Sequence, residues 1–257
     1  MFLLPNNLFG MHIARIFTAL AAIAAISWAV IVAPRFWSEQ IITETASRII
    51  AGEVYRPEFM KGLDEATKID RAGSFRASVL GKAAIVQLRV AENAVAAGDQ
   101  LLIDAQLAAL NKSILAALTN APGDPFLWLA SSWLDKTRGE PSTRSLRRLK
   151  MSYETGPNEG WVALKRSRMM VAMFAALPPD IASMVMSEFI GLARSNFSAE
   201  VANIIEGPGW PIHELLLTAL KDVDVNNRRS IAQILYRDGF DGAVVPGIET
   251  RPLRPWR

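Results

Sequence analysis

The sequence predicts an all-helical protein with one membrane-spanning helix near its N-terminus, followed by a domain of short stacked helices. Three observations lead to this fold class. Residues 16–34 contain no charged side chain and consist mostly of Ala, Ile, Val and Leu. Beyond them, apolar residues recur at helical spacing, with no sustained alternation of apolar and polar residues. Short turns that contain Pro and Gly separate these runs.

The composition agrees with a membrane segment attached to an ordinary domain. Of the 257 residues, 51% are hydrophobic and only 21% are charged, which is more apolar than most soluble domains. The chain has no Cys, so disulfides, thiolate metal sites and cysteine nucleophiles are excluded. The sequence contains no nucleic-acid-reading motif, and the membrane location predicted below further disfavours a nucleic-acid partner.

The apolar run follows a short tail, residues 1–15, and is long enough to cross a bilayer once. At about 1.5 Å per residue, Ile16–Ala33 spans roughly 27 Å, close to the hydrocarbon thickness. Arg15 and Arg35 bound the run. An aromatic cluster stands where the second interface is expected, formed by Trp28, Phe36 and Trp37. We therefore expect a transmembrane anchor over residues 16–34.

A cleaved signal peptide and a buried core helix are the alternatives to an anchor. Cleavage before Pro34 is disfavoured, because Ile31 stands where a small residue is required and Pro would follow the cut. The positive residues on the two sides of the run are nearly balanced, so they do not fix its orientation. A short tail before a large domain is typical of a signal anchor. We expect a single-pass bacterial inner-membrane protein with a periplasmic C-terminal domain.

Helices are expected from the end of the anchor onwards. Residues 35–73 are predicted to form two membrane-proximal helices, 39–52 and 58–70, separated by Arg56-Pro57. A long helix follows over 74–97 and ends at Gly98-Asp99, and another runs over 100–119.

The next helix starts are marked by capping residues and by prolines. Asp124-Pro125 combines an N-cap side chain with Pro at the first helical position. Later helices are expected after Gly139-Glu-Pro141, at Trp161, at Pro178-Pro-Asp180 and near Ser198. Residues 197–245 are predicted to hold the C-terminal helices, and residues 246–257 form a Pro-rich extended tail.

Two segments of the chain are similar to each other. In 114–128 and in 149–161, a helix ends in a Pro-containing turn, and a Trp then begins the next helix. The paired residues, Pro122 with Pro157 and Trp128 with Trp161, lie about one unit of roughly 34 residues apart. Over residues 74–196 the chain resembles the tetratricopeptide repeat. This resemblance implies an α-α solenoid in which each helical hairpin buries its apolar face against its neighbour.

A fainter likeness concerns the turn Gly156-Pro-Asn-Glu-Gly-Trp-Val162 and the helix start Leu177-Pro-Pro-Asp180. On these residues the chain resembles helical, membrane-anchored proteins associated with bacterial polysaccharide synthesis and export. That resemblance implies a role in an envelope assembly.

The sequence offers no catalytic constellation. His213-Glu214 lacks the second His of a zinc-binding helix, because Leu217 stands in its place. Gly207-Pro-Gly209 and Gly81-Lys82 lack the further glycines of a phosphate-binding loop. No nucleophile elbow is present. We therefore expect no catalytic residues, no metal ligands and no cofactor, and a protein that is not an enzyme.

Basic residues outnumber acidic ones between Lys136 and Arg168. Arg144, Arg147 and Arg148 are spaced to share one helical face. The candidate patch for an anionic partner consists of Arg144, Arg147, Arg148, Lys165 and Arg166. It could bind phosphate or carboxylate groups of an anionic lipid, an acidic polysaccharide or a protein. The alternative is an ordinary solvated helix face.

These features predict a membrane-anchored helical-repeat adaptor that binds a protein partner near the membrane. The alternative is a glycan-binding or glycan-processing envelope protein with a groove site. A deep pocket with convergent polar groups and perturbed carboxylates would favour the glycan protein, whereas an open concave face would favour the adaptor.

Overall fold

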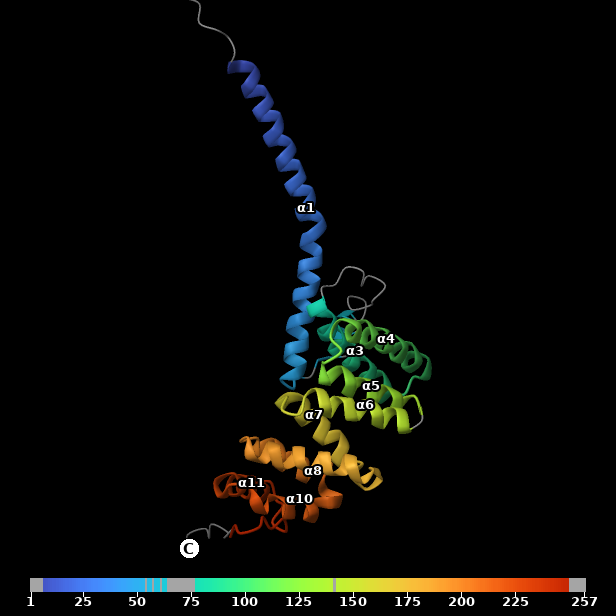
Figure 1. Ribbon diagram of the computed structural model, residues 1–257, viewed down its shortest axis with the longest axis vertical. Coiled ribbons are helices and arrows are strands. Elements are labelled where there is room, and N and C mark those ends of the chain that lie inside the picture. Colours follow the sequence, from blue (N-terminus) through green and yellow to red (C-terminus); the bar gives the residue numbers. More distant parts are fainter. Residues whose placement is uncertain are drawn as a thin grey trace, which may run out of the picture. The chain divides into compact units, whose positions relative to one another are not determined.

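The computed structural model describes residues 7–53, 55–56, 58–60, 62–63, 77–140 and 142–249. Over these residues every regular element is a helix (Figure 1), which confirms the predicted all-α class. The chain divides into two compact units, Met1–Ala121 and Pro122–Arg257, called unit 1 and unit 2 below. Within each unit, helices that follow one another pack as hairpins, an arrangement that fits a repeat-like architecture.

Unit 1 begins with one long helix, α1 (Asn7–Ile50), of 44 residues. The expected boundary at Pro34 and the separate helix over 39–52 were wrong, because α1 continues through both (Figure 1). A proline removes a single backbone donor, and the hydrogen-bonded turns on both sides can hold the helix together. The last part of α1 packs on α3 through buried Ile42, Ala46 and Ile49.

Every side chain from Arg15 to Val30 of α1 is exposed. The large apolar residues among them have exposed fractions of 60–76%, with Ile16 at the lower bound and Phe17 at the upper. Among the described side chains, this apolar stretch is shorter than a full span. Among the described residues, the helix that is long and apolar enough to cross a membrane is α4.

The second half of unit 1 is a helical hairpin, α3 (Ala77–Ala97) and α4 (Gln100–Asn120). Gly98 ends α3 with a φ of 77°, a conformation that glycine adopts without strain. Asp99 caps α4 by accepting hydrogen bonds from the backbone N–H groups of Leu101 (3.1 Å) and Leu102 (3.3 Å). The predicted turn is thus confirmed. The expected helix over 58–70 and the start at 74 lie largely outside the described residues.

Unit 2 consists of seven α-helices joined by tight turns and short 3-10 segments over the residues described. They are α5 (Pro125–Thr137), α6 (Ser142–Thr155), α7 (Gly160–Val171), α8 (Pro179–Arg194), α9 (Ser198–Glu206), α10 (His213–Ala219) and α11 (Val225–Arg237). Helix α5 packs mainly on α6, α7 on α8, and α9 on α11. Buried aliphatic and aromatic side chains, such as Phe126, Leu149, Phe189 and Leu235, fill the space between them.

The start of α5 confirms the capping prediction and fixes the position of the next turn. Asp124 accepts hydrogen bonds from the N–H groups of Phe126 (2.9 Å) and Leu127 (3.2 Å). Phe126 lies against Trp161 at the start of α7, with 5.1 Å between the ring centroids. Trp128 donates a hydrogen bond of 2.7 Å to the carbonyl of Pro122. Trp128 and Trp161 therefore hold structural positions.

Gly156, which follows α6, lies against the first residue of α5. A Cβ atom at Gly156 would lie 2.4 Å from Cγ and 2.6 Å from Cβ of Pro125, closer than any real contact. Any side chain at this position would therefore push the α6–α7 turn away from α5.

We expect Gly156→Ala to destabilise unit 2 by about 1–3 kcal/mol, because the added methyl overpacks a close contact with a rigid proline ring. Gly123→Ala is the matched control, since no atom lies within 4 Å of its added Cβ, and its effect should stay within about 0.5 kcal/mol. Urea denaturation in detergent, followed by circular dichroism, measures both variants. Equal losses of stability in the two variants would contradict a steric clash between the added methyl group and Pro125.

Candidate binding groove and its buried arginine

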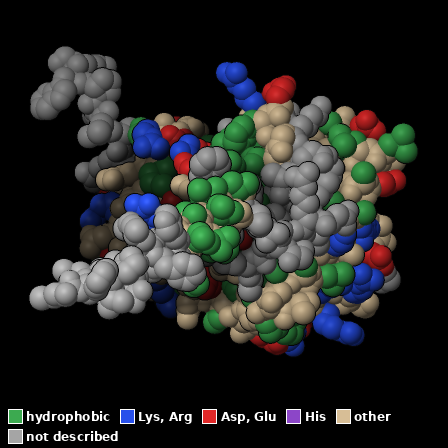
Figure 2. Space-filling view, turned by 90° about the horizontal axis from the view of Figure 1, so that it is seen from above, with side chains coloured by type: hydrophobic (Ala, Val, Ile, Leu, Met, Phe, Trp, Pro, Cys, Tyr) green, Lys and Arg blue, Asp and Glu red, His purple; other side chains and the backbone are tan. Residues whose placement is uncertain are grey.

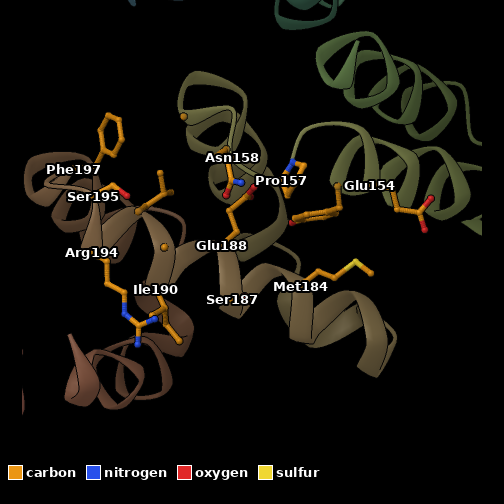
Figure 3. Close-up of a pocket in the computed structure, with 15 residues that line it drawn as sticks. Glu154, Pro157, Asn158, Met184, Ser187, Glu188, Ile190, Arg194, Ser195 and Phe197 are labelled. Carbon is orange, nitrogen blue, oxygen red and sulfur yellow. The ribbon is translucent and has the colours of Figure 1, made fainter. Parts of the chain in front are cut away.

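A groove opens in unit 2 between the α6–α7 turn and α8 (Figure 3). Its volume is about 880 Å³. Pro157 and Asn158 of the turn border one side, and Met184 and Ser187 of α8 border the other. Apolar lining from Ile190, Leu192 and Phe197 alternates with polar lining from Ser195 and Arg194. The groove therefore combines apolar contact surface with groups that can form hydrogen bonds.

The inner wall of the groove includes Tyr153 of α6 and Glu188 of α8, which lie beside Arg166 of α7. Arg166 is fully buried, with 0% of its side chain exposed, and Glu188 is 5% exposed. The Arg166 guanidinium lies over the Tyr153 ring, 4.0 Å from its centroid. A charged side chain this deep in a domain needs a complete set of partners.

Arg166 has such a set. Its Nε donates to Oε2 of Glu188 at 2.8 Å, and its Nη2 also donates to that oxygen. Nη1 donates to the carbonyl oxygen (2.6 Å) and the hydroxyl (2.9 Å) of Ser152, and Nη2 to the carbonyl of Gly156 (3.1 Å). A guanidinium carries five N–H donors, and these five contacts match that number. Arg166 thereby joins α6, the α6–α7 turn, α7 and α8.

The partners of Arg166 are themselves held in place. The Ser152 hydroxyl donates to the carbonyl of Pro125 at 2.7 Å, which extends the network to α5. Ser167 donates to Oε1 of Glu188 at 3.1 Å, so both carboxylate oxygens accept hydrogen bonds. This part of the groove wall is consequently fixed by hydrogen bonds on every side.

Burial shifts the acid–base properties of this wall. Desolvation raises the pKa of Glu188, and the hydrogen bonds and charge of Arg166 offset part of that effect. Desolvation, together with the charge of Glu188, also raises the pKa of Tyr153. The Tyr153 hydroxyl is buried beside the side chains of Arg166 and Glu188, and both act on its pKa.

The structure separates the five residues of the predicted anionic-partner patch. Arg166 lies in the interior with all its donors used, so the expectation that it faces a partner was wrong. Helical spacing alone could not reveal this, because the compensating Glu188 lies on another helix. Lys165, its neighbour, is half-buried.

Arg144 and Arg148 of α6 both turn towards Asp135 of α5. Their guanidinium nitrogens lie 3.2 Å and 2.9 Å from Oδ1 of Asp135, which is 1% exposed. Arg148 also donates to the carbonyl of Ser131 at 3.3 Å, and burial lowers its pKa. These two arginines hold α6 against α5 by neutralising a buried carboxylate. Arg147 is exposed, and Arg144 also stays 48% exposed beside Asp135.

His213 has a structural position as well. Its Nδ1 donates to the carbonyl of Trp210 at 2.7 Å, and its ring stacks on Trp210 with 4.2 Å between centroids. Among the residues that the structure describes, no three His, Cys, Asp or Glu side chains come close enough together to hold a metal ion. The groove is therefore the candidate site.

One border of the groove is a turn that stands out in the sequence, whereas the inner wall was not predicted. The Gly156-Pro-Asn-Glu-Gly160 turn was singled out, and it borders the groove. Neither Tyr153 nor Glu188 was predicted as a site residue. No local signal marks them, because the contact between Arg166 and Glu188 joins two different helices, 22 residues apart in the sequence.

We expect Arg166→Met to destabilise unit 2 by about 3–5 kcal/mol, because it leaves the Glu188 carboxylate buried without a counter-charge. Arg166→Met/Glu188→Gln should recover a large part of this loss, since the neutral amide needs no cation. Arg147→Met is the control for the loss of a positive charge and should stay within about 0.5 kcal/mol. Denaturation of the full chain in detergent measures all three. A double variant as unstable as the single one would contradict the charge argument.

The free energy of unfolding of Arg166→Met should also depend on pH, in a direction that can be predicted. Without Arg166, the pKa of Glu188 in the folded state rises further above its unfolded value of 4.5. The folded state then binds a proton more tightly than the unfolded state, so Arg166→Met loses stability as the pH rises from 5 to 8. The original chain keeps its counter-ion and should change less over this range. A parallel pH profile for the two proteins would exclude Glu188 as the source.

No family model matches the chain, and no curated protein and no solved structure matches it. The resemblance to the tetratricopeptide repeat stays a prediction.

Proposed function

We propose that the chain is a membrane-anchored helical adaptor of the bacterial cell envelope that holds a protein partner in the groove of unit 2. The observation that carries the anchor is the uninterrupted exposure of Arg15–Val30, an apolar segment with a charge only at its first residue. Exposure of this apolar surface to water would be strongly unfavourable, whereas its contact with the hydrocarbon of a bilayer would not be. Figure 2 shows one cluster of exposed hydrophobic side chains, and charged side chains stand elsewhere in the same view.

The proposed anchor and the part of α1 that packs in unit 1 belong to one continuous helix. Glu39 and Ile42 are the first buried residues after the apolar run with described side chains, and they belong to α1 itself. The helix would therefore leave the bilayer and enter the packed part of unit 1 without a linker. We further propose a single inner-membrane pass over residues 16–34, with the C-terminal part in the periplasm.

The groove is suited to recognition more than to acid–base chemistry. Its buried carboxylate, Glu188, accepts hydrogen bonds on both oxygens and is paired with Arg166. The remaining surface offers apolar contact at Met184 and Phe197 and a polar rim at Asn158. A segment of a partner protein that carries one apolar anchor side chain and a backbone available for hydrogen bonding fits this lining. In this proposal the hairpins form a tetratricopeptide-like solenoid, and the partner belongs to an assembly for polysaccharide synthesis or export.

A glycan is the second candidate occupant of the groove. Its volume of about 880 Å³ suits a small ligand, and Tyr153 and Glu188 lie in its wall. The aromatic ring and polar side chains of the wall are also compatible with a sugar.

The anchor is tested by placing charges in it. We expect Ile23→Arg/Ile26→Arg to release the chain from membranes washed with carbonate, because each arginine costs about 2.5–3.5 kcal/mol near the centre of a span. Gln40→Arg places the same charge on an exposed position of the packed part of α1 and should remain in the membrane. Quantitative immunoblotting of pellet and supernatant gives the result. Retention of the double variant would exclude the anchor.

The groove is tested by site-specific photocross-linking in native membranes. A benzophenone side chain at exposed Ser187 in the groove should capture a protein partner that is identified by mass spectrometry. The same group at Thr143, exposed on α6, is the control. Met184→Arg should reduce the captured product several-fold by filling the groove, whereas Arg147→Glu should not.

The outcomes of the cross-linking experiment separate the candidates. Loss of capture with Arg147→Glu but not with Met184→Arg would move the partner to the basic face of α6. Equal capture from Ser187 and Thr143 would contradict a specific groove. Absence of any protein, together with protection of Ser187 by added envelope oligosaccharide, would support the glycan.

A further inference from the structure

Helix α4 presents an apolar stripe to solvent. Leu101 is 84% exposed and Leu115 is 54% exposed, and Ala105 and Ala108 lie between them on the same helical face. The opposite face is buried and packs on α3. A helix that buries one face in its domain normally carries polar residues on the other. Helix α4 carries apolar residues on both faces, and by length and composition it could cross a membrane.

Few charged side chains lie on or beside this stripe. Lys112 lies on the stripe and is exposed, whereas no Asp or Glu lies on it. Asp104 lies at its edge and accepts a hydrogen bond from Gln100 at 3.0 Å. By contrast, the exposed face of α6 carries Arg147 and Lys150.

The stripe belongs to the unit that contains the proposed anchor. Glu39 of α1 is already buried, and it lies only five residues beyond Pro34, a rise of about 8 Å along the helix. The polar region of one leaflet is about 5–8 Å thick. The packed part of unit 1 would then begin at the membrane surface, and within it α3 packs on both α1 and α4.

We propose that the stripe formed by Leu101, Ala105, Ala108 and Leu115 binds the bilayer surface, so that α4 lies in the plane of the interface. This inference rests on the proposed anchor, which brings unit 1 to the lipid. An interfacial helix of this kind buries its apolar face to the depth of the headgroups and acyl chain ends, and its basic side chains reach back to anionic headgroups.

The chain has no Cys, so single-cysteine variants of the full protein can each carry one environment-sensitive nitrobenzoxadiazole probe. Leu115→Cys reports on the stripe, Ile23→Cys on the anchor and Lys150→Cys on the charged face of α6. The labelled proteins are reconstituted into vesicles of phosphatidylcholine and phosphatidylglycerol, and circular dichroism checks that each is folded. We expect blue-shifted emission from the first two probes, with quenching by iodide several-fold weaker than for the probe at position 150.

Lipids that carry a quenching doxyl group decide between the possible causes of protection. Strong quenching at position 115 by a doxyl group near the headgroups, and at position 23 by one deep in the acyl chain, supports the inference. An anchor probe quenched by lipid and a stripe probe open to iodide would overturn the inference while leaving the anchor intact. A stripe probe that is protected from iodide but not quenched by any lipid would also overturn it, since protein would then cover α4. An unprotected anchor probe would instead exclude the proposed anchoring.

Discussion

The buried guanidinium of Arg166 is the interaction on which the architecture of unit 2 depends. It bonds to Ser152 and Gly156 on one side and to Glu188 on the other, so α6, the following turn and α8 are positioned by one side chain. Such a group is strongly directional, because each N–H must find an acceptor in a fixed plane. The helices can therefore shift little relative to one another without leaving a donor unpaired. The groove owes its shape to this constraint.

A second buried charge in unit 2 is also neutralised by side chains of a neighbouring helix. Asp135 is buried in α5 and draws Arg144 and Arg148 of α6 towards it. Basic residues in this region thus serve the interior as much as the surface. A cluster of arginines in a sequence can indicate a binding face or a set of counter-ions for acidic residues inside the fold, and only their partners distinguish the two.

Local signals predicted the helices well, and long-range contacts explain what they missed. Capping by Asp99 and Asp124 depends on adjacent residues, and both turns were foreseen. Continuation of α1 through Pro34 was not, because a single proline does not outweigh the turns that flank it. The pairing of Arg166 with Glu188 depends on how α7 meets α8, which no spacing in the sequence encodes. The turn at Gly156 could be identified as special, but the groove beside it could not.

The continuity of α1 has a mechanical meaning. A helix of 44 residues is about 66 Å long, and it runs from the apolar segment into the contacts with α3 without a flexible joint. With the segment in a bilayer, the height of unit 1 above the lipid would be set by helix geometry alone. Rotation or tilt of the segment would move the α3–α4 hairpin with it, because one continuous helix joins the segment to the contacts with α3. The helix would then hold unit 1 at a fixed distance from the membrane. A flexible linker would set only the largest distance that the domain could reach.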